Sequence, residues 1–185
     1  MISDQHVIGA TQNWLTKFII AFNICPFARR EQQRNSIRYR VSRTDRAETA
    51  LETLIEECRF LDENPETETT LLILPNGFKD FDDYLDMLDI AERLLHAQRY
   101  EGIYQLASFH PDYCFEMASE LEQDDPANYT NRSPYPMLHI IRESSIERAV
   151  ATYPDPENIP ARNIKLTREL GLEKLQALLA ACYHE

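Results

Sequence analysis

The apolar run at residues 70–74 places the tightest limit on the fold, because it reads Thr-Leu-Leu-Ile-Leu without a polar break. Such a run is typical of a central strand that is buried on both faces, whereas a strand with one solvent face alternates. Helical stripes flank it over residues 47–61 and 81–95, and Asp80 is positioned to cap the second helix. We therefore expect a sheet with helices on both of its faces.

Three further strands are expected at residues 36–42, 102–109 and 137–143. The two short β–α–β units predict right-handed crossovers between parallel strands, with the last strand antiparallel beside the third. The expected fold class is α/β. It is a three-layer sandwich around a small, mostly parallel four-stranded sheet with one antiparallel strand, and the N- and C-terminal helices share one face.

Composition narrows the class of protein. A chain of 185 residues predicts a single domain spanning residues 1–185, and a net charge of −12 argues against nucleic acid or anionic membranes as partners. No apolar run is long enough for a membrane helix, and the N-terminus lacks the pattern of a signal peptide. Four scattered cysteines without a C-x-x-C pair favour a reducing cytoplasm. The sequence identifies neither a cofactor nor an oligomeric state.

The long connection over residues 110–136 is the predicted site. It is bordered by His110 and His139 and contains the polar, proline-rich segment Asn-Arg-Ser-Pro-Tyr-Pro at residues 131–136. Long loops inside compact domains are usually functional or disordered, and the aromatic residues here argue against disorder. A small anionic ligand is the expected partner, because a guanidinium binds carboxylate or phosphate in a bidentate manner. The candidate ligand-binding residues are Asn131, Arg132, Ser133, Arg142 and Arg29.

Cys25 is the candidate nucleophile. Pro26 favours the first position of a short helix over residues 26–33, which would place the thiol at the positive end of that helix. This position predicts a thiol pKa below that of a free cysteine, with Arg29 assisting. His110 would act as the base, oriented by Asp112, and His139 completes the candidate catalytic set. The alternative is a kinked helix with a buried, inert Cys25.

Two other hypotheses about the same residues remain open: a zinc site and a non-catalytic binding protein. His110, Asp112 and Cys114 alternate along an extended stretch, and with His139 or Cys25 they match the ligand types of a tetrahedral zinc site. The protein can equally be a non-catalytic binding or interaction protein. In that case the histidines are core residues, Arg132 pairs with a carboxylate, and the prolines stiffen a surface loop.

The chain resembles a bacterial family known as domain of unknown function 1415. The resemblance rests on Cys-Pro-Phe-Ala at residues 25–28, Phe-His-Pro at 109–111 and the Asn-Arg-Ser-Pro-Tyr-Pro segment, followed by His139 and by Arg142 and Glu143. It covers nearly the whole chain in the order of these motifs. It implies a bacterial, cytosolic protein and carries no activity with it.

Overall fold

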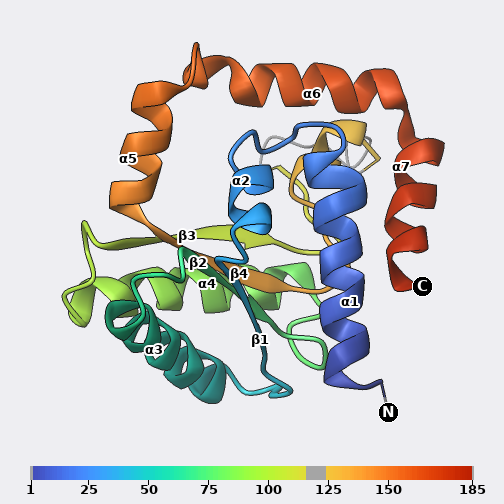
Figure 1. The fold of residues 1–185 in the computed structure, drawn as a ribbon. Coiled ribbons are helices and arrows are strands. Elements are labelled where there is room, and N and C mark those ends of the chain that lie inside the picture. The colour runs from blue at the N-terminus through green and yellow to red at the C-terminus, as the bar shows by residue number, and fades with distance from the viewer. Residues whose placement is uncertain (1, 116–123, 185) are drawn as a thin grey trace.

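The computed structural model describes residues 2–115 and 124–184, and a four-stranded sheet lies at its centre (Figure 1). The strand order is β1-β2-β4-β3. β1 and β2 are parallel, and β4 runs antiparallel to both β2 and β3. The strand bounds are β1 Ile37–Val41, β2 Thr69–Ile73, β3 Tyr104–Phe109 and β4 Met137–Arg142.

The predicted antiparallel pairing of the last strand with the third is confirmed. As expected, three strands run in the same direction and β4 is the antiparallel one. β4 inserts between β2 and β3, however, so only β1 and β2 form a parallel pair of neighbours among the four strands. All five residues of β2 are buried, as the apolar run predicted for a central strand. The crossover from β2 to β3 therefore spans the position that β4 later occupies.

Helices cover both faces of the sheet. α3 and α4 pack on Leu72, Leu74, Leu138 and Ile140, while α1, η1 and α7 pack on Leu71, Ile73 and Met137 from the other side. Alternate strand residues thus belong to two separate hydrophobic cores, one on each face of the sheet. The N- and C-terminal helices share one face, as expected. The bounds are α1 Asp4–Trp14, η1 Leu15–Ile20, α3 Ala47–Glu63, α4 Phe81–Ala97 and α7 Leu172–Ala180.

The remaining helices lie around the α1 side of the sheet (Figure 1). α5 leaves the end of β4, α6 crosses over, and α7 returns beside α1, while α2 lies in front of the sheet. No residue of α5 or α2 is fully buried, so these helices border the core and do not fill it. Their bounds are α2 Ala28–Gln33, η3 Pro126–Thr130, α5 Glu143–Thr152, η4 Pro156–Asn158, α6 Ile159–Leu170 and η5 Ala181–Tyr183.

Candidate functional site

His110 follows β3 directly and is fully buried. Its Nδ1 accepts the backbone N–H of Asp112 at 3.0 Å, so Nε2 carries the proton and donates to the Phe78 carbonyl at 2.9 Å. The rings of Phe81 and Tyr84 pack against it with centroids 5.1 Å away. Burial lowers the pKa of His110, which keeps the ring neutral.

This geometry does not support the expected role of His110 as a base oriented by the Asp112 carboxylate. Both ring nitrogens already have partners, and Asp112 contributes its backbone N–H. His110 also packs against α4, whereas Cys25 packs against the core on the α1 side of the sheet. The sheet therefore separates the two proposed catalytic partners.

Asn131 and Ser133 stabilise the loop itself. The Asn131 side chain donates to the Ser108 carbonyl at 3.1 Å, and its backbone carbonyl accepts the His110 N–H at 3.2 Å. Asn131 thus supplies hydrogen-bond partners to the Ser108 carbonyl and the His110 N–H at the end of β3, as a residue of a neighbouring strand would. Ser133 is fully buried and donates to the Tyr135 carbonyl at 2.7 Å.

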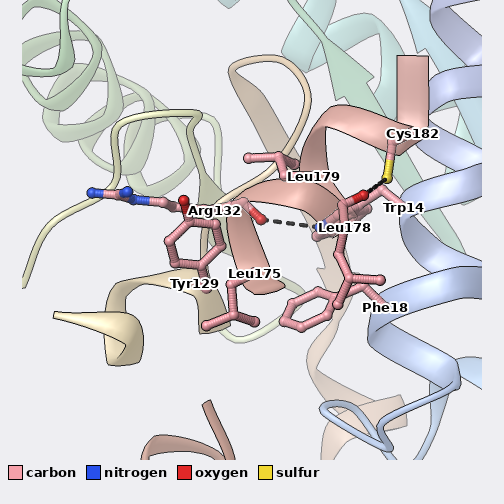
Figure 2. A pocket seen from close by; sticks show the side chains of 8 residues that line it. All are labelled: Trp14, Phe18, Tyr129, Arg132, Leu175, Leu178, Leu179 and Cys182. Atoms are coloured by element: carbon pink, nitrogen blue, oxygen red, sulfur yellow. Dashed lines mark hydrogen bonds between the residues drawn. The ribbon is translucent and has the colours of Figure 1, made fainter. Parts of the chain in front are cut away.

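Arg132 is likewise held by the protein. Its Nε donates to the Tyr113 carbonyl at 3.1 Å, and its guanidinium carbon lies 4.8 Å from the centroid of the Tyr129 ring. Its backbone carbonyl accepts the indole N–H of Trp14 at 3.0 Å, which ties the loop to α1. In Figure 2 the guanidinium points away from the neighbouring leucines of α7.

The crevice drawn in Figure 2 is too small for a ligand. It encloses about 10 Å³, roughly the space of one water, and is lined mainly by apolar side chains of α1 and α7. Arg132 also lines the crevice, but the other residues around it are mainly apolar. The crevice is therefore a packing gap between α7 and the loop, and it does not provide the expected anion pocket.

Arg142 and Arg29 bind carbonyl groups in other parts of the fold and not beside Arg132. Arg142 is the last residue of β4 and donates to the Leu61 carbonyl at 2.6 Å and to the Thr67 carbonyl at 3.0 Å, at the C-terminal end of α3. Arg29 is exposed on α2 and donates to the Ile20 carbonyl at 3.3 Å. The expected set of ligand-binding residues is thus spread over separate parts of the fold.

Cys25 lies in the turn before α2, which begins at Ala28 and not at Pro26. Burial raises the pKa of the thiol. The backbone N–H groups of Phe27 and Ala28, which donate to the sulfur, and the nearby Arg162 act in the opposite direction without overcoming burial. The favourable backbone groups were predicted correctly, but the lowered pKa was wrong because the sequence pattern did not reveal the burial.

The zinc hypothesis is also contradicted. No group of three or more His, Cys, Asp or Glu side chains in residues 2–115 and 124–184 lies close enough to hold a metal ion. His110 has no free ring nitrogen, and Cys114 contacts the Asn128 amide at 3.8 Å. His139 lies on the α1 side of the sheet, away from the α4 side that His110 contacts.

His139 belongs to a sheet face that carries no charge. On the α1 side, the strand register gives three rows of four residues. The three arginines of the strands, Arg38, Arg40 and Arg142, alternate onto the other side. The rows are Ile37, Thr69, Ile141 and Gln105; Tyr39, Leu71, His139 and Ala107; and Val41, Ile73, Met137 and Phe109.

In the third row Ile73 and Met137 are buried and Val41 and Phe109 are partly exposed, with Trp14 of α1 packed edge-on against Phe109. In the other two rows, Gln105 is exposed and Tyr39, Ala107, His139 and Ile141 are partly exposed, while Leu71 between them is buried. The helices thus leave part of this face accessible. We call the residues Tyr39, Gln105, Ala107, His139 and Ile141 the open face.

The imidazole of His139 is available on the open face. No group of the described residues is hydrogen-bonded to its ring, and the ring of Phe109 lies 6.1 Å away. Burial lowers the pKa of His139 to about 4, so the ring is neutral near pH 7. Across Leu71, burial raises the pKa of Tyr39 to about 12, so its hydroxyl is neutral as well.

The sequence singled out His139 but not its neighbours on the open face. Tyr39 comes from β1, whereas Gln105 and Ala107 come from β3, and only the observed register places Tyr39 and Ala107 in the row of His139. The alternation of apolar and basic residues in β1 already indicated that Tyr39 points away from Arg38 and Arg40. It did not indicate which strand lies beside it.

The family described as "Protein of unknown function (DUF1415)" matches residues 6–177. Because this match spans most of the chain, the protein belongs to the DUF1415 family. No curated protein and no solved structure matches the chain. None of the helices in the described part of the chain is long and apolar enough to cross a membrane.

Proposed function

We propose that this member of the DUF1415 family is a non-catalytic binding protein that holds a small uncharged molecule on the open face. The observation that carries the proposal is His139, a neutral imidazole on the sheet with no hydrogen-bond partner among the described residues. Polar groups inside folded proteins are normally hydrogen-bonded, so an available one at a partly exposed position favours a ligand.

The chemistry of the open face favours an uncharged ligand. Its polar groups are the His139 ring, the Tyr39 hydroxyl and the Gln105 amide, and its other members are Ala107 and Ile141. These groups offer hydrogen bonds and apolar contact, whereas an anion requires a cationic partner to replace its hydration. The strand arginines lie behind the sheet, so they do not supply that partner.

The expected thiol chemistry receives less support. No hydrogen bond joins Cys25 to His110 or His139 within the described residues. The pKa of the thiol is raised, which reduces the thiolate that a nucleophile needs. Binding without a chemical step therefore accounts for these residues better than catalysis does.

Benzamide and benzoate form a matched pair of probes, because the two molecules share a ring and differ in charge. In a titration followed by amide NMR, benzamide should shift the β3 and β4 signals around Ala107 and His139, with a Kd on the order of 1 mM. Benzoate should bind more weakly, since the protein has a net charge of −12.

Three variants sharpen this test. His139→Phe keeps a ring and removes the hydrogen bonds, and Ala107→Phe fills the row beside it, so both should weaken benzamide binding. Arg132→Gln should leave benzamide binding unchanged. Tighter binding of benzoate than of benzamide, or shifts centred on Asn131 and Arg132, would show that the ligand is an anion held by the loop.

A further inference from the structure

β3 is an edge strand, and part of its outer side has no hydrogen-bond partner among the described residues; one residue of this strand, Gln105, also belongs to the open face. The Glu143 N–H donates to the Ile103 carbonyl at 2.9 Å, so residues 103, 105, 107 and 109 direct their backbone groups toward β4. The alternate residues Tyr104, Leu106 and Ser108 therefore direct theirs outward. Asn131 confirms this phase, since its side chain binds the outward carbonyl of Ser108.

Four outward backbone groups have no partner among the described residues. The N–H of Tyr104 is bonded to the Tyr100 carbonyl, and Asn131 occupies the carbonyl of Ser108. The carbonyl of Tyr104, both groups of Leu106 and the N–H of Ser108 are left. These four groups are the set that one antiparallel strand engages when it adds to an edge.

A groove of about 420 Å³ lies along the same edge. Tyr104, Gln105 and Leu106 all line it, although Gln105 points to the other face of the sheet from its two neighbours. Residues of both faces can line one groove only where it includes the strand edge. The opposite wall comes from the C-terminal half of α4, where Leu95 and His96 contribute.

The charge of the groove selects its occupant. Glu92, Glu101 and Glu143 line it, and the cationic group that accompanies them is His96 when it is protonated beside Glu101, at 2.8 Å. A second copy of this chain would bring its own glutamates against them in a molecule of net charge −12. A basic segment would instead be attracted, because opposite charges across an interface favour association.

We propose that the edge of β3 binds an extended basic peptide segment of a partner protein, which adds as a fifth strand. Its backbone bonds to Tyr104, Leu106 and Ser108. Its lysines or arginines lie on the α4 side beside Glu92 and Glu101, and its alternate apolar side chains lie on the other side, beside Gln105. Main-chain hydrogen bonds of this kind supply affinity with little dependence on sequence, while the glutamates supply the preference for a basic segment.

The probe is the acetylated hexapeptide amide Lys-Val-Lys-Val-Lys-Val, carrying a fluorophore, and binding to the full chain is followed by anisotropy. The wild-type protein should bind it, and added salt should weaken the complex. The same peptide with glutamate in place of lysine, and a version methylated at every backbone nitrogen, should bind at least about tenfold more weakly. Equal binding of the methylated peptide would overturn strand addition.

Protein variants separate the contribution of the glutamate charges from that of the main-chain hydrogen bonds. The double variant Glu92→Gln/Glu101→Gln should weaken binding about tenfold, whereas the control Glu52→Gln/Glu173→Gln changes the net charge equally on exposed sites outside the groove and should not. Leu106→Pro removes an outward N–H at an edge position that tolerates proline. Loss of binding in the control pair, failure of the wild type to bind, or a dimer of the free protein through β3 would each contradict the proposal.

Discussion

Two buried tyrosine hydroxyls differ in whether they are hydrogen-bonded. The Tyr84 hydroxyl donates to the Met137 carbonyl at 2.7 Å and accepts the Phe109 N–H at 3.2 Å, so it joins α4 to both β4 and β3. The Tyr135 hydroxyl is buried without a partner in the described residues. An unsatisfied buried hydroxyl carries its full desolvation cost, whereas a bonded one recovers it.

The same substitution should therefore have opposite effects at these two positions. Tyr84→Phe should lower the free energy of unfolding by about 1–3 kcal/mol, because two backbone groups lose their partner. Tyr135→Phe should leave it unchanged or raise it by up to about 1 kcal/mol. Urea unfolding of both variants measures the difference, and equal destabilisation by the two changes would contradict these hydrogen-bond assignments.

Cys25 shows how far a local sequence pattern extends at the scale of one residue. The pattern predicted backbone N–H groups directed at the sulfur, and Phe27 and Ala28 provide them. It could not predict burial, because the cover comes from the core on the α1 side of the sheet, which includes residues of α1, β2 and α7. Burial decides the direction of the pKa shift, so the local argument gave the wrong sign.

At the scale of elements, Arg142 connects the end of β4 to the end of α3. Its guanidinium donates to the carbonyls of Leu61, Asn64 and Thr67, and to the Tyr104 hydroxyl at 3.3 Å. Leu61 lies in the last turn of α3, and Asn64 and Thr67 follow that helix, so this side chain ties the end of α3 and the segment after it to β4. Arg142 is therefore a structural residue.

Removing this guanidinium should destabilise the fold without affecting ligands. Arg142→Ala should lower the free energy of unfolding by about 2–3 kcal/mol, and Arg142→Lys should recover only part of that, since an ammonium cannot reach several carbonyls in a planar fork. Arg148→Ala, an exposed control beside Glu68, should cost at most about 1 kcal/mol. A loss for Arg142→Ala no larger than for this control, in urea unfolding, would refute the role.

The positions of helices and strands could be predicted from the sequence where the signal is local. Asp80 caps α4 by accepting the N–H groups of Asp82 and Asp83, as its position before a helical stripe predicted. The insertion of β4 between β2 and β3 did not follow, because strand order depends on packing between segments far apart in the chain. The proposed site depends on that order, so the sequence singled out His139 but not Tyr39 or Ala107.

At the scale of the whole molecule, the net charge of −12 is unevenly distributed. The open face has no charged residue, while the groove beside β3 contains three glutamates. The total charge correctly describes an acidic protein, but it says nothing about this separation. Two surfaces with different partners, an uncharged small molecule and a basic peptide, are consistent with it.

The composition of the loop over residues 110–136 suggested a ligand site, but the partners observed for its described polar residues lie within the protein. In its described part, Asn131 closes the edge of β3, Ser133 bonds within the loop, and Arg132 ties it to Trp14 through its carbonyl. Polar residues and prolines mark an ordered connection as readily as a ligand site. Only the partners of each side chain distinguish the two.

The proposed function requires that the His139 ring is available to a ligand and that the His110 ring is not. An NMR titration of the histidine side chains tests it most directly. His110 should titrate below the ordinary value of 6.5 and carry the proton of its neutral ring on Nε2, His139 should stay neutral until the pH falls to about 4, and benzamide should shift the signals of His139 alone. A midpoint for His139 near the ordinary value of 6.5, or a response to benzamide at His110 and not at His139, would contradict the account.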